Sequence, residues 1–432
     1  MKILVIIAVL MMPMFVDCQK FEWDDEILID AVYRQADDST WTPKAISEAE
    51  YQQAVEAIQR RAHQIADVKW SPVGAVPRNG GITYPAGKSV SGIPYSSVKE
   101  LDKFVGHEVS FYTFLTAVQN PKSVLYTENV SQSPYHGVNC ASYYGTVCSI
   151  SVNYALGLDA PYESSMYAKL PFFEKVANQS PEAVKVGDVL WKPGHVVMVE
   201  DVNDSDGSVE SVSILESNGS GTSIRKYTYA EFSNRWKTYS WVLYRYLDFA
   251  RVLEQDSIQF LSSLDQDNYT VSLNAPLCPS RGDRACYREG EDVILNVLGK
   301  FEDAVYIRRD GRLVYKFYCE SDDLKLTGLT AGIYEVSLSD GQTICSFEVV
   351  QTEVNVRKVS SGMAIDYSSS NGIPENVILC TATGTRKYIH VITDEERESG
   401  RIIIPYTDGV EYLKVFFRGE YGRVSNEPIG VR

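Results

Sequence analysis

Two residues in the middle of the chain combine side-chain types and settings that could support nucleophilic chemistry. Cys148 begins the helix-compatible run CSISVNYALG, just after a turn that contains glycine. Unpaired N–H groups at a helix N-terminus carry partial positive charge, which stabilises a thiolate over a thiol. His195 follows a Pro-Gly turn at the head of the strand-like run HVVMVEDV. There it could exchange a proton with the thiolate, so the pair predicts a cysteine nucleophile with a histidine base.

A third polar group follows in the next strand-like run, VSILESNGSG. Glu216 and Asn218 lie two residues apart and therefore on one face of a strand. Either side chain could accept a hydrogen bond from the second imidazole nitrogen of His195 and fix its tautomer. Among the five histidines of the chain, His195 is the one in a strand that looks catalytic. His390, in the strand-like run KYIHVIT, is interpreted as a packing residue.

Each assignment has a structural alternative. Cys140, in GVNCASYYG, also precedes a helix-compatible stretch and is the rival nucleophile. A disulfide between Cys140 and Cys148 would abolish the chemistry. Cys148 could instead be a buried structural thiol, His195 a core histidine with satisfied hydrogen bonds, and Glu216 a solvated charge on a hairpin.

At residues 144–218 the motifs resemble two groups of cell-wall hydrolases. The pattern C-S-x-x-V-x-Y-A-L-G, followed by V-G-D-V-L and G-H-V-V-M-V-E, looks like the NlpC-type cysteine peptidases. The run G-H-V-V-M-V-E-D-V, with its D-G hairpin and then E-S-N, is similar to the CHAP amidases. Both groups belong to a papain-like superfamily in which a helix bears the cysteine and a small antiparallel barrel bears the histidine.

The resemblance implies Cys148 as nucleophile, His195 as base and Glu216 or Asn218 as the third member. It also implies hydrolysis of an amide bond in peptidoglycan peptides or at the peptide–sugar junction, without a cofactor. Tyr95, in the turn GIPYS, resembles the tyrosine with which the family binds the substrate amine.

The match to these families has departures. Ile150 replaces the glycine that commonly follows Cys-Ser in the NlpC-type pattern, and the Glu/Asn pair replaces a frequent histidine. Tyr95 lies far upstream of Cys148, which requires an insertion near residues 98–138. That insertion could form a lid over the site.

The elements around these motifs change character near residue 250. Before it, Ser47 and Glu50 form a capping-box pair at the head of a helical pattern, Ser97 and Glu100 repeat that signature, and VSFYTFLTAVQ is apolar enough for a buried helix. The strand-like runs are 186–191, 195–202 and 212–217. Beyond residue 250 the helical periodicity almost disappears, and short strands alternate with turns, among them Asp310-Gly311.

This pattern predicts an α+β papain-like cysteine hydrolase domain followed by two all-β, immunoglobulin-like sandwiches. The expected divisions are a signal peptide over 1–18, a catalytic domain with an N-terminal helical extension over 19–250, and sandwiches over 257–350 and 351–432. In the first sandwich, Cys278 and Cys286 could close a disulfide loop around an Arg-Gly-Asp turn. Cys319 and Cys345 are either buried apolar residues or a second bridge.

The N-terminus indicates export. Lys2 is followed by the apolar run ILVIIAVLMMPMFV, which has the length of a signal-peptide core and is too short for an ordinary spanning helix. The run ends near Cys18, which could carry a lipid. No later segment is apolar enough to span a bilayer. We therefore expect a periplasmic or cell-surface protein, tethered through Cys18 if that residue is lipidated.

The composition excludes several partners. The chain has 432 residues, with 41 Lys and Arg against 57 Asp and Glu, and its net charge of −16 disfavours nucleic acid and anionic membranes as partners. The eight cysteines show no spacing typical of a metal site. Two hypotheses result: an exported bacterial cysteine hydrolase of wall peptides, or an inactive wall-associated binding or adhesion protein on the same fold. In either, the β domains could contact carbohydrate or wall.

Overall fold

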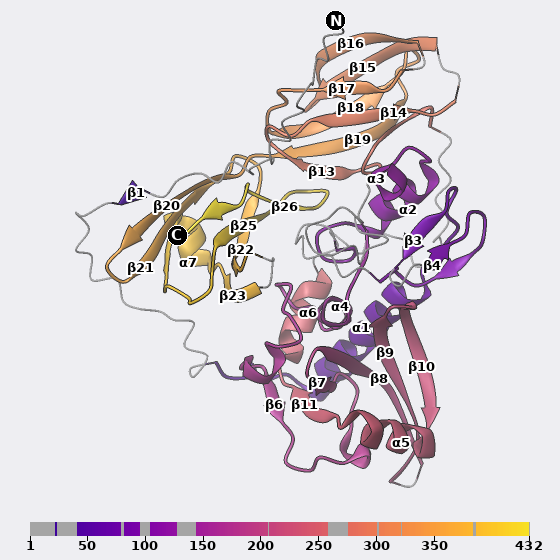
Figure 1. The fold of residues 1–432 in the computed structure, drawn as a ribbon, viewed down its shortest axis with the longest axis vertical. Coiled ribbons are helices and arrows are strands. Elements are labelled where there is room, and N and C mark those ends of the chain that lie inside the picture. The colour runs from indigo at the N-terminus through magenta and orange to yellow at the C-terminus, as the bar shows by residue number, and fades with distance from the viewer. Residues whose placement is uncertain are drawn as a thin grey trace, which may run out of the picture.

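The computed structural model describes most of the chain. The described residues are 22–23, 41–78, 82–95, 104–127, 144–205, 207–257, 275–299, 302–320, 322–382 and 386–431. The expected signal peptide, the Cys18 lipid site, the rival nucleophile Cys140 and the helix expected after Ser97 lie outside these residues. The chain forms one mixed unit of helices and sheet and two all-β units (Figure 1).

A six-stranded antiparallel sheet is the framework of the first unit. Its strands, in spatial order, are β10 (Gly221–Thr228), β9 (Ser208–Asn218), β8 (His195–Ser205), β7 (Val189–Lys192), β11 (Val242–Tyr246) and β6 (Phe173–Lys175). The three runs predicted as strands correspond to β7, β8 and β9, and β8 and β9 form the hairpin expected at Asp206-Gly207. Gly207 has φ +79°, which suits a tight turn.

Helices cover both faces of this sheet. The helices of the first unit are α1 (Glu48–Asp67), α2 (Phe111–Gln119), α3 (Val124–Thr127), α4 (Cys148–Ala155), α5 (Tyr229–Tyr239) and α6 (Phe249–Ser257). Short elements complete the unit: β2 (Lys69–Trp70) with β5 (Val90–Ser91), β3 (Val76–Arg78) with β4 (Ile82–Tyr84), and the 3₁₀ turns η4 (Tyr167–Lys169) and η5 (Pro181–Ala183).

Strand alternation divides the apolar side chains between two cores. Val196 and Met198 of β8 face the core that contains α1, α2 and α4, whereas Val197 and Val199 face a second core beneath α5. The capping box at Ser47 and Glu50 begins α1 as predicted. However, α1 is buried against α4 and the sheet, and the Tyr154 hydroxyl donates to Gln64 Oε1 at 2.8 Å. The helix is thus part of the first unit's core and not an extension of it.

The middle unit is a sandwich of two sheets. The five-stranded sheet has the order β13-β19-β18-β15-β16 and packs on the three-stranded sheet β12-β14-β17 around one core. The strands are β12 (Leu277–Pro279), β13 (Ala285–Arg288), β14 (Val293–Val297), β15 (Glu302–Arg309), β16 (Arg312–Glu320), β17 (Leu324–Leu326), β18 (Gly332–Ser337) and β19 (Thr343–Val350). The predicted turn at Asp310-Gly311 joins β15 to β16, and both residues have positive φ.

The last unit is a second sandwich. One sheet has the order β1-β20-β21-β24, and the other joins β23, β22, β25 and β26, with β27 paired to β25. The strands are β1 (Glu22–Trp23), β20 (Glu353–Val359), β21 (Gly362–Ser368), β22 (Ile373–Cys380), β23 (Arg386–Val391), β24 (Arg401–Ile404), β25 (Tyr412–Arg418), β26 (Arg423–Ser425) and β27 (Ile429–Gly430).

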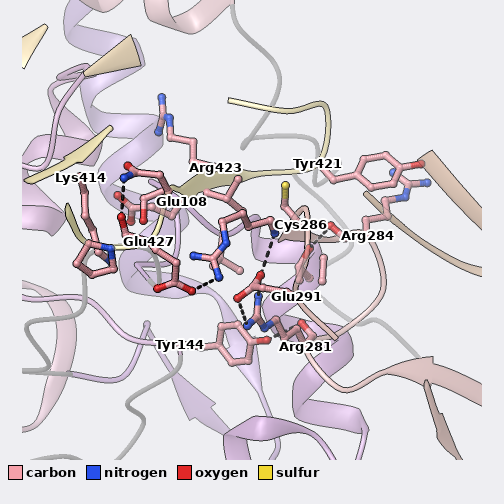
Figure 2. A pocket seen from close by; sticks show the side chains of 18 residues that line it. Glu108, Tyr144, Arg281, Arg284, Cys286, Glu291, Lys414, Tyr421, Arg423 and Glu427 are labelled. Atoms are coloured by element: carbon pink, nitrogen blue, oxygen red, sulfur yellow. Dashed lines mark hydrogen bonds and ion pairs between the residues drawn. The ribbon is translucent and has the colours of Figure 1, made fainter. Parts of the chain in front are cut away.

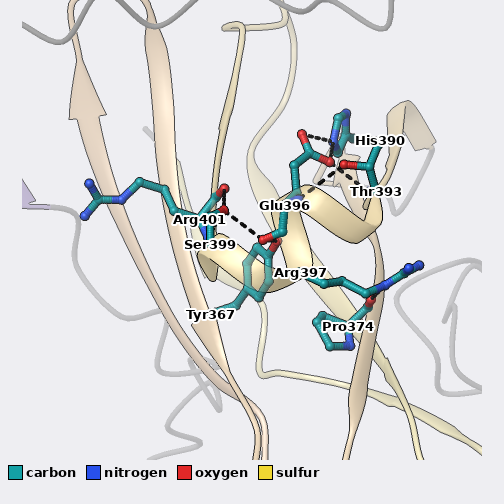
Figure 3. Close-up of polar contacts among 8 residues, drawn as sticks. All are labelled: Tyr367, Pro374, His390, Thr393, Glu396, Arg397, Ser399 and Arg401. Atoms are coloured by element: carbon teal, nitrogen blue, oxygen red, sulfur yellow. Dashed lines mark hydrogen bonds and ion pairs between the residues drawn. The ribbon is translucent and has the colours of Figure 1, made fainter.

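Two features of this sandwich differ from the expectation. β1 pairs in parallel with β20, so residues 22–23 belong to the last unit's sheet and not to the first unit. A helix, α7 (Asp394–Ser399), interrupts the strands. It begins with a capping box between Thr393 and Glu396, and the same Glu396 carboxylate pairs with buried His390 at 2.9 Å (Figure 3). His390 thus anchors α7, which fits its interpretation as a packing residue.

The unit boundaries follow the elements. α6 packs against α1 through Phe249, whose ring lies 4.8 Å from that of Tyr51, so the first unit continues to residue 257 and past the expected end at 250. β19 ends at Val350 and β20 begins at Glu353, which is where the expected seam between the sandwiches falls. No helix among the described residues is both long and apolar enough to cross a membrane.

The six cysteines in the described part of the chain are free thiols. Cys278 lies in β12 of one sheet, whereas Cys286 lies in β13 of the other, so the expected disulfide loop is absent. The second bridge, between Cys319 and Cys345, is absent as well. Burial in the sandwich core raises the pKa of Cys345 far above its usual range, and such a thiol behaves as an apolar residue.

The turn that contains the Arg-Gly-Asp triplet docks the middle sandwich onto α2. The Asp283 carboxylate accepts from the Tyr112 hydroxyl at 2.8 Å, and the Asp283 N–H donates to Thr116 Oγ1 at 2.9 Å. Gly282 is buried, with φ +91°, and a Cβ there would lie 2.2 Å from the Thr113 carbonyl oxygen. The triplet therefore forms a turn, as expected, and that turn belongs to an interface between units.

The last sandwich docks onto the first unit through two buried arginines. Arg386 donates its backbone N–H to Glu163 at 3.2 Å and its guanidinium to the Pro161 carbonyl. Arg423 donates its guanidinium to the His107 carbonyl and its backbone N–H to the Glu108 carbonyl at 3.0 Å. Buried charges that lose such partners are costly, so these contacts hold the sandwich in a fixed place.

The docking turn gives a stability prediction. Gly282→Ala adds a Cβ that collides with α2, and we expect it to lower the free energy of unfolding by about 3 kcal/mol or more. Gly290→Ala is the matched control, because Gly290 has φ +89° and no atom within 4 Å of an added Cβ. It should cost only about 1 kcal/mol, for the left-handed backbone. Chemical denaturation measures both, and equal losses would contradict the docking contact.

A second prediction concerns the place of the last sandwich. Arg386→Ala should speed hydrogen exchange of the backbone in residues 159–163 by roughly tenfold, because the Pro161 carbonyl and Glu163 both lose their contact with the guanidinium. Arg397→Ala removes an arginine whose described contacts, with Pro374 and Asp394, stay within the same sandwich. It should leave that loop unchanged. If hydrogen exchange is unaltered in the Arg386 variant, the last sandwich is connected to the first unit by the chain but is not held against it by this contact.

Candidate active site

The candidate nucleophile occupies the first residue of helix α4. Cys148 is 8% exposed and belongs to the main core of the first unit. Val147 stands at the N-cap and offers no side-chain hydrogen bond to the helix, so the cysteine lies among free N–H groups. The hydroxyl of buried Tyr167 shares its hydrogen between the Ser149 carbonyl oxygen, at 3.1 Å, and Asn153 Oδ1. These contacts fix the position of helix α4 within the core.

The candidate base and its partner lie on adjacent strands. His195 begins β8, and its Nε2 lies 3.0 Å from Glu216 Oε1 on β9. Cys148 is close enough to His195 to be one of the groups that raise the pKa of its imidazole. Because Nε2 is engaged by the carboxylate, Nδ1 is the ring nitrogen left to face the thiol. Three side chains from α4, β8 and β9 therefore form one connected row, in the chain order predicted for nucleophile, base and orienter.

The carboxylate of Glu216 has a second cation on its other side. Arg235 of α5 donates from Nη2 to both oxygens of Glu216, at 2.9 and 2.8 Å. The guanidinium lies 4.7 Å from the ring centre of Tyr239 and 5.3 Å from that of Tyr227. With the Glu216 side chain only 6% exposed, this packing fixes both the position and the charge of the carboxylate.

These contacts determine the protonation states. Burial lowers the pKa of His195, but the hydrogen bonds and charges of Cys148 and Glu216 outweigh it and raise the pKa to about 9. Burial raises the pKa of Glu216, but His195 and Arg235 outweigh that effect and bring the pKa below its usual range. At neutral pH the site therefore holds an imidazolium beside the cysteine and a carboxylate behind the imidazolium. A neighbouring imidazolium favours the thiolate form of a cysteine.

Asn218 has a different role. Its Oδ1 accepts the backbone N–H of Ser220 at 2.9 Å, within the turn that joins β9 to β10. This contact is a local turn bond of the kind that asparagine commonly makes. Of the two residues left open by the sequence, the structure brings Glu216 to the imidazole and shows Asn218 in the hairpin turn.

Tyr95 lies beside the start of the nucleophile helix, despite its distance in sequence. It pairs in a β-bridge with Thr146, and the Thr146 N–H donates to the Pro94 carbonyl at 3.0 Å. Burial, together with the charge of Cys148, raises the pKa of the Tyr95 phenol. The phenol is thus neutral and near the thiol, where it can act as a hydrogen-bond donor or acceptor.

The segment between Tyr95 and Cys148 is in part a core element. Within it, residues 104–127 contribute Phe111 and Phe114 to the main core and dock the middle sandwich through α2. A lid formed by these residues is therefore excluded. The remaining residues of the expected insertion, 98–103 and 128–138, lie outside the described part of the chain.

The other described histidines pair with carboxylates in structural settings. His63 contacts Asp67 on the surface of α1, His107 contacts Glu108 in a domain interface, and His390 anchors α7. Within the described residues, no group of three or more His, Cys, Asp or Glu side chains could hold a metal ion.

Arg235 is the site residue that the sequence analysis missed. It lies on α5, which was not predicted, although Thr228 and Glu231 form a capping box at its start. That Thr-x-x-Glu signature could have located the helix. The contact between Arg235 and Glu216 has no local signal, because it depends on how α5 packs across β9.

Comparisons with known proteins do not establish a family. No protein-family model and no curated protein matches the sequence. Solved structures with matching segments include an Escherichia coli alpha-2-macroglobulin fragment spanning domains NIE-MG1 (TM-score 0.17, 10% identity, covering 37% of this chain and 99% of that one). The fibronectin(III)-like modules of Clostridium thermocellum CbhA match with TM-score 0.18, 16% identity and 38% and 94% coverage. At these TM-scores, neither likeness bears on fold or function.

The site predicts how His195 titrates. Its pKa is raised, so its ion pair with Glu216 contributes full stability below about pH 6.5 and loses it as the pH rises through about 9. Cys148 and Glu216 both raise this pKa, and Glu216→Gln removes the second of these charges, so we expect His195 to titrate at least about 1 pH unit lower. Asn218→Ala is the matched control and should leave the titration unchanged. NMR of labelled histidine measures the pKa of His195 in both variants, and His195→Ala identifies the signal of this residue. A lowered pKa in the Asn218 variant alone would make Asn218, and not Glu216, the partner of His195.

Proposed function

We propose that the chain is an exported bacterial cysteine hydrolase that cleaves amide bonds in peptidoglycan peptides. The observation that carries the chemistry is the hydrogen bond between His195 and Glu216, with Cys148 close enough to the imidazole to raise its pKa. The wall-peptide substrate and the papain-like fold rest on the resemblance of residues 144–218 to NlpC-type peptidases and CHAP amidases. Export rests on the apolar run after Lys2.

In the proposed mechanism, the Cys148 thiolate attacks the carbonyl carbon of the scissile amide. The resulting oxyanion accepts a hydrogen bond from the backbone N–H of Cys148, at the free end of α4. His195, protonated up to about pH 9, gives its proton to the leaving nitrogen as the carbon–nitrogen bond breaks. The products of this step are an amine and a thioester on Cys148.

Water completes the cycle. Neutral His195 takes a proton from the water that attacks the thioester, and the carbon–sulfur bond breaks to release the acid and restore the thiolate–imidazolium pair. Glu216 stays ionised throughout, because Arg235 compensates its charge while His195 is neutral. The carboxylate thus holds the ring orientation in both halves of the reaction.

The place of Tyr95 supports a role in substrate binding. Its β-bridge with Thr146 puts it beside the nucleophile, and its phenol is neutral at physiological pH. It would bind the free amine of a wall peptide through the phenol oxygen. The two sandwiches would position the hydrolase and could contact carbohydrate or wall.

The proposal predicts the outcome of a nucleophile deletion. Cys148→Ala should abolish the release of fragments from purified peptidoglycan while retaining the melting temperature within about 3 °C, because the residue contributes little beyond its thiol. Cys286→Ala is the matched control, since burial and the Glu348 charge raise the pKa of that thiol far above its usual range. It should retain full activity.

Mass analysis of the released peptides measures the result and distinguishes an endopeptidase from an amidase. Hydrolysis that survives in Cys148→Ala would remove this residue from the mechanism. Wall binding by the wild-type protein, without any bond cleaved, would favour the alternative of an inactive wall-associated binding or adhesion protein.

A further inference from the structure

A cavity of about 240 Å³ lies where the three units meet (Figure 2). Its walls come from the segment before α2 and from Tyr144 in the first unit, from the turn and strand around Arg284 in the middle sandwich, and from Lys414 and the region of β26 in the last sandwich. Cys148, His195 and Glu216 are not among its lining residues. The cavity is therefore a separate site that exists only in the docked arrangement.

The lining is cationic in a chain whose net charge is −16. Five arginine or lysine side chains face three glutamates. Two of the arginines are paired with lining carboxylates: Arg281 lies 3.2 Å from Glu291, and Arg288 contacts Glu427. A third lining arginine, Arg423, is paired with Glu375, which is not itself a lining residue. With Glu375 counted, five cations face four carboxylates, so an excess of one cation remains. Such an excess attracts an anion into a partly enclosed space, where solvent screens charges less.

Arg284 is the lining cation that no carboxylate neutralises. Its guanidinium lies 4.9 Å from the ring centre of Tyr112, and none of the ion pairs between described residues includes it. Figure 2 shows it at one edge of the cavity beside Tyr421, opposite Lys414. Its backbone has φ +56°, which is uncommon for a residue with a side chain. Strain of this kind persists where surrounding contacts impose it, and it concentrates at binding sites.

The walls also supply unused hydrogen-bonding capacity. The buried hydroxyl of Ser425 has no hydrogen-bond partner among the described residues. Arg284 is exposed at the rim of the same cavity. A guanidinium and a hydroxyl that line one cavity suit carboxylate or phosphate oxygens better than neutral groups. The cavity volume is below that of sites for drug-sized ligands, which restricts the occupant to a small molecule.

We propose that this cavity binds a small anion that carries carboxylate or phosphate groups, with Arg284 as its main charged contact. The ligand touches all three units at once, so its binding stabilises their docked arrangement. This site is independent of the proposed hydrolysis, because its walls contain none of the three residues of that mechanism.

Calorimetric titration of the full chain with citrate, inorganic phosphate and glucose, at constant ionic strength, tests the proposal. Saturable binding of citrate identifies a carboxylate site, and saturable binding of phosphate a phosphate site. Arg284→Asn keeps a residue that tolerates the left-handed backbone and removes the charge, so it should weaken anion binding by about tenfold. Arg312→Asn, at an exposed arginine outside the cavity, should change nothing.

A second variant, which is expected to tighten anion binding, distinguishes the loss of a specific contact from damage to the fold. Glu427→Gln frees Arg288 from its lining partner and should tighten anion binding by roughly threefold or more, which a damaged fold would not do. The proposal is overturned if neither anion binds saturably, if glucose binds as tightly as both anions, or if Arg284→Asn binds them as well as the wild type does.

Discussion

The Glu216 carboxylate lies between two cations, His195 and Arg235, in a site from which most water is excluded. An unpaired carboxylate buried to this extent would take up a proton or destabilise the fold, because desolvation penalises the charge. His195 and the Arg235 guanidinium together lower the pKa of the carboxyl, and Cys148 and the ionised carboxylate together raise the pKa of the imidazole. The protonation state of His195 therefore depends on this arrangement.

The same constraint explains why four secondary-structure elements must be fixed relative to one another. The paired strands β8 and β9 set the spacing of His195 and Glu216, α4 brings Cys148 to the strand end, and α5 closes the far side with Arg235. Apolar cores on both faces of the sheet hold these helices in place. The sandwiches add contacts outside this centre, and Arg386 reaches the loop that follows the nucleophile helix.

The features that could be predicted from the sequence are those that depend on interactions between residues close together in the chain. Local signals sufficed for α1, with its Ser47 cap, for the hairpin after β8 and for the turn at Asp310. Local signals also identified Cys148 and His195 as candidate site residues. The choice between Glu216 and Asn218 depended on how β9 pairs with its neighbours and on a turn bond to Ser220, neither of which has a signature in composition or spacing.

The docking of the units could not be predicted from local signals either, because it depends on contacts between segments far apart in the sequence. The insertion that could have formed a lid supplies α2, whose Tyr112 donates a hydrogen bond to Asp283, 171 residues further along the chain. Nothing in either segment alone indicates the other. The disulfide expected between Cys278 and Cys286 is absent because these residues lie in different sheets, which sequence spacing does not reveal.

The rate of alkylation of Cys148 by iodoacetamide between pH 5 and pH 10, mapped to the residue by mass spectrometry, tests the thiolate–imidazolium pair most directly. The pair predicts that Cys148 reacts at pH 6 to 7 about tenfold faster than Cys278, Cys286 or Cys345, whose pKa values are raised by burial. It also predicts that His195→Ala removes this advantage. A Cys148 that is inert at neutral pH, or one that reacts equally fast without His195, would contradict the account.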